Sequence, residues 1–204
     1  MKHWIACLFS AVLFGCLPGC ASVEMRTVRL KSVPRKDMAL VTFVRQAIFL
    51  GDGTDVDLWD GPRYVGSLAA GRMVQLDVAP GQHLFLANAE NWSYASGELE
   101  AGKQYVLKVN VFPGVVMNRA FFGIAKPDDK RIPEWLAQMK PTAASAQGRL
   151  EVAERKQAAI RQAIADFDAG KATFTKIPPD SGFQRLPVPV PTSGLASAGA
   201  DPSR

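Results

Sequence analysis

From Met38 to about residue 126, the sequence consists of short runs of apolar, β-branched and aromatic residues at regular spacing. Glycine, proline, aspartate and asparagine separate these runs, which is the pattern of strands joined by turns. We therefore predict a mainly β fold, an antiparallel β-sandwich of about seven strands over residues 38–126. The expected strands are 39–45, 56–59, 64–68, 72–78, 82–88, 96–100, 103–111 and 121–125.

Two turns have clear signals. Asp60-Gly61 lies between two strand-like runs and predicts a hairpin, because glycine tolerates positive φ and aspartate can hydrogen-bond within its own turn. Pro62 follows directly and favours a loop longer than two residues. Pro80-Gly81 predicts another turn, with proline setting φ and glycine taking the left-handed position.

After Pro127 the sequence favours a helical extension over residues 127–170. Asp128 or Asp129 can cap a short helix that ends before Pro141. A second helix is expected from Thr142 or Ser145 to about residue 169, docked against one surface. Its apolar stripe comprises Leu150, Ala153, Ile160, Ile164 and Phe167.

The last segment, residues 171–204, is rich in proline, serine, alanine and glycine. Such a composition buries too little apolar surface to form a core. We therefore predict a disordered tail after the helices, with extended polyproline geometry in its Pro-rich part.

The N-terminus has the pattern of an export signal. Lys2 is followed by an apolar stretch that is shorter than the roughly 20 residues of a transmembrane helix. Residues 17–20, Leu-Pro-Gly-Cys, resemble the bacterial lipobox. The resemblance implies cleavage after residue 19, a diacylglycerol on the Cys20 thiol and an acyl chain such as palmitate on the new amine. Cys16 offers a second, poorer cleavage register.

The cysteine distribution agrees with lipidation. The chain has three cysteines, Cys7, Cys16 and Cys20, and none lies beyond residue 20. A secreted protein that used disulfides would carry them in its folded part. We expect lipid attachment at Cys20 to the outer membrane, facing the periplasm, with residues 20–37 as a basic tether.

The charge is mildly basic, with 24 Lys and Arg against 19 Asp and Glu, and it is spread along the chain. This distribution does not indicate a nucleic-acid partner.

The turn and strand motifs together resemble a family of small bacterial envelope lipoproteins catalogued as a domain of unknown function. The resemblance covers residues 38–126 and implies a β-sandwich similar to carbohydrate- and surface-associated modules. It carries no catalytic residues. The motifs are Phe43-x-Arg45, Val56-x-Leu58-x-Asp60-Gly61, Val65-Gly66-x-Leu68, Gly71, Ala79-Pro80-Gly81-Gln82-His83 and Leu99-x-Ala101-Gly102-Lys103-x-Tyr105.

The sequence offers little for catalysis or metal binding. Beyond the signal it has one histidine, His83, which is best interpreted as a residue at the start of a strand. Zinc sites draw on several His or Cys ligands, so no metal or other cofactor is expected. Four aspartates form the one acidic group, either a calcium loop or, as we favour, a solvated strand face with turn residues. They are Asp52, Asp55, Asp57 and Asp60.

Four aromatic residues raise the alternative of a sugar-stacking surface: Trp59, Trp92, Tyr94 and Trp135. Trp92 and Tyr94 are expected in a loop, where binding residues concentrate, and are the candidate surface-binding pair. The competing interpretation is that they belong to the core of the sandwich.

We thus expect a lipid-anchored, non-enzymatic envelope protein whose sandwich contacts an envelope protein, peptidoglycan or polysaccharide. The alternative is a periplasmic ligand carrier or enzyme that uses a pocket between the sheets. The scarcity of histidine and cysteine favours the first.

Overall fold

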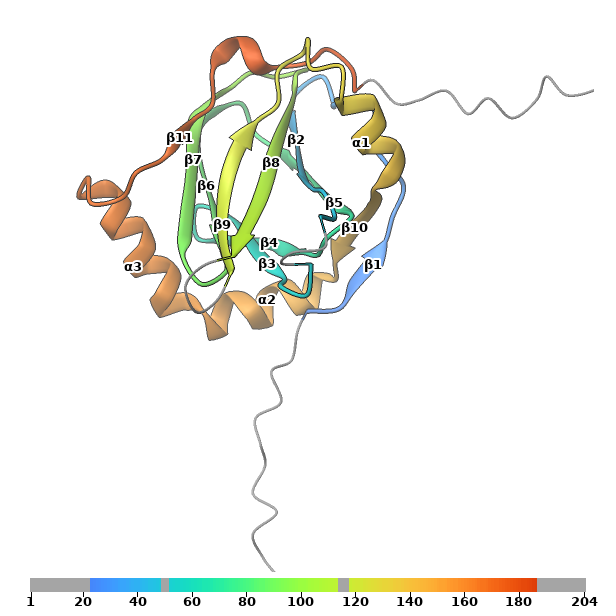
Figure 1. Cartoon of the computed structure of the whole chain (residues 1–204). Coiled ribbons are helices and arrows are strands. Elements are labelled where there is room, and N and C mark those ends of the chain that lie inside the picture. Colours follow the sequence, from blue (N-terminus) through green and yellow to red (C-terminus); the bar gives the residue numbers. More distant parts are fainter. Residues whose placement is uncertain (1–22, 49–51, 114–117, 187–204) are drawn as a thin grey trace, which may run out of the picture.

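Two β-sheets packed face to face form the body of the protein (Figure 1). The computed structural model describes residues 23–48, 52–113 and 118–186. One sheet has six strands in the order β1-β10-β5-β2-β8-β9, and the other has five in the order β11-β7-β6-β3-β4. The strands are β1 (Met25–Thr27), β2 (Ala39–Arg45), β3 (Val56–Asp60), β4 (Arg63–Leu68), β5 (Arg72–Val78), β6 (Gly81–Asn88), β7 (Trp92–Leu99), β8 (Gln104–Pro113), β9 (Asn118–Ile124), β10 (Lys140–Ala144) and β11 (Thr175–Lys176).

The mainly β, two-sheet architecture confirms the coarse prediction, but the sheets are mixed rather than antiparallel. Three strand pairs are parallel: β2 with β8, β10 with β5, and β11 with β7. Each of these pairs joins strands separated by other elements, and long connections permit either direction. The neighbouring hairpins β3–β4, β6–β7 and β8–β9 are antiparallel, as short connections require.

Alternating apolar residues of both sheets fill the space between them. Val41 and Phe43 of β2 lie among the buried residues, together with Phe85 of β6. The rings of Phe43 and Phe85 meet edge to face across the two sheets, with centroids 5.4 Å apart. Burying a phenylalanine contributes about 1.5–3 kcal/mol relative to leaving it exposed, so this packing explains how the sheets hold together.

The hairpin between β3 and β4 is tighter than the proline suggested. Asp60 pairs with Arg63, which leaves only Gly61 and Pro62 in the turn. Gly61 has φ of +52°, and a turn with glycine first accommodates the fixed negative φ of proline second. The prediction of a longer loop was therefore wrong.

Helices cover the outer faces of both sheets (Figure 1). Helix α1 (Ile132–Gln138) packs on the six-stranded sheet. Helices α2 (Ala146–Arg155) and α3 (Gln157–Asp168) pack on the five-stranded sheet, where the expected single helix is interrupted at Lys156. Ser145 caps α2 by accepting a hydrogen bond from the Gly148 N–H at 3.0 Å. Within the described ranges, no helix has the length and apolar character needed to cross a membrane.

Part of the expected tether belongs to the sheet. β1 pairs antiparallel with β10, from Met25 opposite Ala144 to Thr27 opposite Thr142. The Met25 sulfur also accepts a hydrogen bond from the backbone N–H of Ser67 in β4 at 3.5 Å. Inserting this apolar side chain between two strands orders a segment whose overall composition is polar.

The prediction of a disordered tail from residue 171 is likewise wrong for residues 171–186. β11 pairs with β7, a 3₁₀ turn follows at Pro179–Ser181, and Phe183 forms a backbone bridge with Gln104 of β8. Ile177, Phe183 and Leu186 are buried and supply the apolar contacts of this segment. Residues 187–204 lie outside the described ranges.

Candidate functional site

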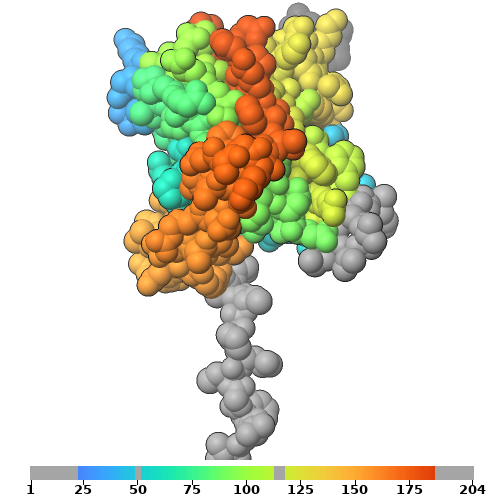
Figure 2. Space-filling model, turned by 90° about the vertical axis from the view of Figure 1, so that its left-hand side faces the viewer, coloured from blue at the N-terminus to red at the C-terminus, as the bar shows by residue number. Residues whose placement is uncertain are grey.

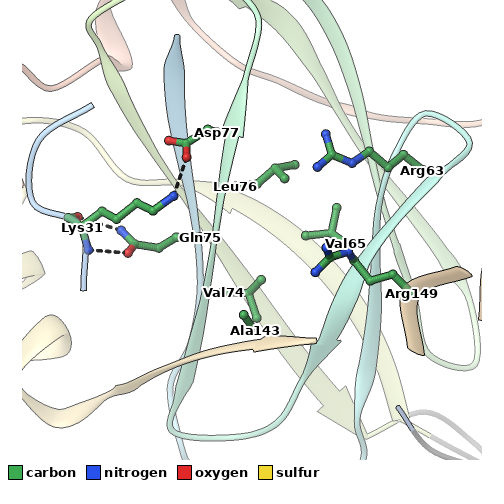
Figure 3. A pocket seen from close by; sticks show the side chains of 9 residues that line it. All are labelled: Lys31, Arg63, Val65, Val74, Gln75, Leu76, Asp77, Ala143 and Arg149. Atoms are coloured by element: carbon green, nitrogen blue, oxygen red, sulfur yellow. Dashed lines mark hydrogen bonds and ion pairs between the residues drawn. The ribbon is translucent and has the colours of Figure 1, made fainter. Parts of the chain in front are cut away.

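A small pocket opens where the edge of the five-stranded sheet meets the six-stranded sheet (Figure 3). β4 is the edge strand of one sheet, and β5 is its neighbour in the other. β10 pairs with β5 only from Arg72 to Val74, so the second half of β5 has no partner on that side. The pocket lies beside this free half, between Leu76 and Asp77 of β5 and Val65 of β4.

Lys31 closes one side of the pocket by binding the outer face of β5. Its ammonium group forms an ion pair with Asp77. Its backbone also exchanges two hydrogen bonds with the amide of Gln75: Lys31 N–H donates to Oε1 at 2.7 Å, and Gln75 Nε2 donates to the carbonyl at 2.9 Å. Asp77 is therefore already neutralised by a cation of the chain itself.

Two arginines enter the pocket from the opposite side. Arg63 begins β4 and Arg149 lies in α2, and Figure 3 shows the Arg63 guanidinium pointing toward Leu76 and that of Arg149 beside Val65. Arg149 donates from Nη1 to the Ala144 carbonyl at 2.6 Å, which holds its guanidinium group in place. Among the described residues, Arg63 has no hydrogen-bond or ion-pair partner. Neither arginine forms an ion pair with another described residue, and Lys31 and Asp77 neutralise each other, so the lining carries a net positive charge.

The base of the pocket is apolar. Val65, Val74, Leu76 and Ala143 line it, and its volume is about 190 Å³. This is smaller than the roughly 300–1,000 Å³ of sites that enclose whole drug-sized ligands. The pocket thus fits one group of a larger molecule, with an apolar part against the valines and an anionic part against the arginines. Guanidinium groups bind carboxylates and phosphates through paired N–H donors.

The sequence did not single out these pocket residues. Lys31 falls in the predicted tether 20–37, Arg63 between two predicted strands, and Arg149 within the predicted second helix. Their convergence depends on β10 and α2 crossing the sheet edge, and no local motif marks it.

His83 lies elsewhere, on β6, and both of its ring nitrogens are occupied. Nδ1 is 2.8 Å from Asp60 Oδ1, and Nε2 is 2.8 Å from the Ala79 carbonyl oxygen. The ring also stacks on Phe85 with centroids 5.6 Å apart. These contacts agree with a residue that holds strands together, and the hydrogen bond to Asp60 raises the histidine pKa.

The four aspartates do not converge. Asp57 accepts a hydrogen bond from the Tyr64 hydroxyl at 2.8 Å and forms an ion pair with Lys156, whereas Asp60 binds His83. Asp52 accepts a hydrogen bond from the Ile48 N–H at 3.1 Å. No group of three or more potential metal ligands occurs in the described part of the chain.

The structure places Trp92 and Tyr94 in strand β7 rather than in a loop. Tyr94 is only 6% exposed, because α3 covers it: its hydroxyl donates to the Ala163 carbonyl at 3.3 Å and its ring stacks on Phe167. Trp92 is partly buried against the same cluster. Tyr94 therefore offers no ring face for a ligand, and the expected surface pair is wrong for this residue.

Trp59 and Trp135 also lie apart from each other. Trp59 is fully buried beneath α2 and α3. Trp135 of α1 lies between two cations, with Lys108 Nζ 5.1 Å and Arg131 Cζ 5.0 Å from its ring. The four aromatic residues thus do not form one platform. Cys20, the predicted lipidation site, lies outside the described residues.

Comparison with known proteins assigns no family. No family model matches the sequence, and no curated protein matches it. Among solved structures, the chain is similar to an NMR structure of a protein from Eubacterium rectale, at 10% identity and a TM-score of 0.30. The match covers 47% of this chain and 95% of that one.

Proposed function

We propose that this chain is a lipid-anchored, non-enzymatic binding protein of the bacterial cell envelope, and that its pocket receives an anionic group of another envelope component. The lipobox-like residues before Cys20 support the anchor and an outer-membrane location facing the periplasm. The turn motifs support kinship with the envelope lipoproteins of unknown function that residues 38–126 resemble.

One observation carries the binding proposal: Arg63 and Arg149 converge on a pocket with an apolar base. Because Lys31 already neutralises Asp77, the Arg63 guanidinium and the N–H groups of Arg149 that do not bind Ala144 remain for a ligand. The matching ligand group is a carboxylate or phosphate attached to a short apolar segment. Envelope components of this chemistry include the carboxylates of peptidoglycan stem peptides, phosphorylated polysaccharides and the acidic side chains of protein partners.

The ligand class is testable with small molecules that share a short alkyl chain but differ in the head group. Purified protein carrying C20S is titrated with hexanoate, hexyl phosphate and hexanol while its thermal unfolding is followed. The two anions should raise the Tm, since a ligand that binds only the folded state stabilises it. Hexanol lacks the charge and should leave the Tm unchanged.

The double variant R63Q/R149Q is the decisive comparison. Charge-assisted hydrogen bonds contribute about 1.5–3 kcal/mol each, so losing both should weaken anion binding by more than tenfold. R161Q is the matched control, because Arg161 is an exposed arginine of α3 whose guanidinium donates to Gln157. Equal affinity of R63Q/R149Q and R161Q for hexanoate and hexyl phosphate would contradict the proposal.

A further inference from the structure

The chain enters the folded domain beside α2. Val23 is the first described residue, and it packs against the first turn of this helix. The contact is close: a Cβ added to Gly148 would lie 2.6 Å from Val23 Cγ2. Because only three peptide units separate Cys20 from Val23, the lipid-bearing residue lies at most about 11 Å from this point. A lipid on Cys20 would hold the domain directly on the bilayer, without a long spacer.

The same end of the domain carries the joined ends of β8 and β9. Figure 1 shows this hairpin, α2 and the beginning of β1 at the lower edge of the molecule. Figure 2, turned by 90°, again places α2 at the lower end of the domain. The anchor therefore defines which end of the sandwich faces the membrane.

Apolar side chains are exposed at this end. Phe112 of β8 is 52% exposed and Phe121 of β9 is 45% exposed, and their rings lie 6.1 Å apart. Ile48, 51% exposed, follows β2, which runs parallel to β8 and is paired from Leu40 opposite Gln104 to Val44 opposite Lys108. Val44 lies opposite Lys108, and four residues further along each chain come Ile48 and Phe112, so the two lie near the same end of the sheet.

Phe112 and Phe121 share one face of the six-stranded sheet. Side chains alternate between the two faces of β8, so Phe112 lies on the same face as Val106, which packs under α1. Phe121 shares that face because it pairs with Asn110. Helix α1 covers the part of the face around Val44, Met73 and Val106 and leaves the part toward the hairpin uncovered. A contiguous exposed apolar patch is a candidate site of contact with another protein or a membrane.

A cation accompanies the aromatic pair. Arg119 lies directly opposite Phe112 in the β8–β9 ladder and is exposed. Aromatic rings beside arginine suit the boundary of a bilayer, where the rings enter the acyl region and the guanidinium reaches the lipid phosphates. Leu150 of α2, 67% exposed, lies at the same lower end on the element next to Val23.

We propose that Ile48, Phe112, Arg119 and Phe121 form a membrane-contact surface, which rests on the bilayer that holds the lipid of Cys20. The inference rests on the proposed lipid anchor and adds an orientation to it. The domain lies with its β8–β9 hairpin against the lipid, and the opposite end, where Gln104 meets Phe183, faces away.

The test uses the fact that Cys20 is the only cysteine in residues 20–204. The chain 20–204 is coupled through this thiol to vesicles containing a maleimide lipid, so the result does not depend on whether cells lipidate it. F112W introduces a reporter at the proposed surface. Its added emission should be lost when the vesicle lipids carry brominated acyl chains, which quench indoles that touch them.

V33W is the matched control. Val33 is 58% exposed and follows Ser32, whose carbonyl accepts a hydrogen bond from Gln104 at the start of β8. It therefore lies at the end of β8 away from Phe112, and its emission should be the same in brominated and plain vesicles. Equal emission of F112W in both vesicles overturns the proposal. The proposal is also overturned if F112W emission depends on the number of protein molecules per vesicle and not on lipid bromination, because the surface then binds a second copy of the chain.

Lipid attachment itself is tested separately, by labelling cells with a palmitate analogue. If Cys20 is unlabelled while F112W is quenched, the anchor fails and the contact surface stands. If Cys20 is labelled and F112W is not quenched, the anchor stands and the orientation is wrong.

Discussion

His83 Nδ1 lies 2.8 Å from Asp60 Oδ1, which links β6 to the end of β3. The opposite ring nitrogen faces the Ala79 carbonyl at 2.8 Å. Both neighbours are hydrogen-bond acceptors, so both ring nitrogens can donate only when the imidazole is protonated. The hydrogen bond to Asp60, supported by the Ala79 carbonyl, raises the pKa of His83 above its ordinary 6.5 although burial opposes this.

The raised pKa predicts a pH-dependent stability. The folded state holds the proton more tightly than the unfolded state, so its stabilisation is complete below the unfolded pKa of 6.5. This stabilisation is lost as the pH rises from 6.5 through the higher pKa that His83 has in the folded state. Urea unfolding measured across neutral pH should give a free energy of unfolding that falls in this window.

The variant D60N isolates the effect. Asparagine can still accept a hydrogen bond from Nδ1 but carries no charge, so the stability decline above pH 6.5 should shrink. H83Q should remove it altogether. A slope that persists in H83Q would show that another group titrates in this range.

Tyr94 should behave as a core residue. Y94F removes the hydroxyl that donates to the Ala163 carbonyl and should cost about 0.5–1.5 kcal/mol. Y94A also removes the ring stacked on Phe167 and should cost about 3–5 kcal/mol. Denaturant unfolding measures both. If Y94A leaves the melt intact, the tyrosine is not holding α3 on the sheet.

Gly97 should be required for the docking of the C-terminal segment. A Cβ at this position would lie 2.6 Å from the Ile177 carbonyl oxygen and 2.7 Å from Ile177 Cβ. G97A must therefore push the segment away from β7, and we expect a loss of about 1–3 kcal/mol. Hydrogen exchange should increase first at Ile177, whose N–H donates to the Ser96 carbonyl at 2.8 Å.

G53A is the matched control for G97A. Gly53 has an ordinary negative-φ backbone and nothing within 4 Å of an added Cβ. Its substitution should leave both the unfolding free energy and the exchange rates unchanged. An equal loss in both variants would assign the effect to the glycine backbone rather than to contact with Ile177.

Cys20 should determine membrane attachment. C20S removes the thiol that would carry diacylglycerol and should release the exported protein into the soluble fraction, whereas C16S should have no effect. Fractionation of cells expressing each variant measures this. Continued sedimentation of C20S with membranes would contradict lipidation at this residue.

Strand positions could be predicted from the sequence because they depend on local patterns. β2 and β5 have the expected bounds, 39–45 and 72–78, and Gly61 marks a real hairpin. Strand direction could not be predicted, since the parallel pairing of β2 with β8 depends on distant contacts. β1, β10 and β11 were missed because each is at most five residues long and completes a sheet formed elsewhere.

The candidate site could not be predicted for a related reason. Arg63, Arg149 and Lys31 belong to three segments whose sequences indicate a turn, a helix and a tether. They meet where α2, the start of β4 and the half of β5 beyond its pairing with β10 come together. Tyr94 was predicted to lie in a loop before a strand expected at 96–100, whereas β7 already begins at Trp92 and α3 buries the tyrosine.

The C-terminal segment ties the two sheets together, and this has a consequence for the order in which the chain folds. Ile177 donates to β7 of one sheet, and Phe183 bridges to Gln104 of the other. A chain emerging N-terminus first cannot make the first contact until residue 177 is available, or the second until residue 183 is available. Folds completed by such distant pairings form slowly. If the chain is exported as proposed, the sandwich would stay incomplete until this C-terminal segment has also crossed the membrane.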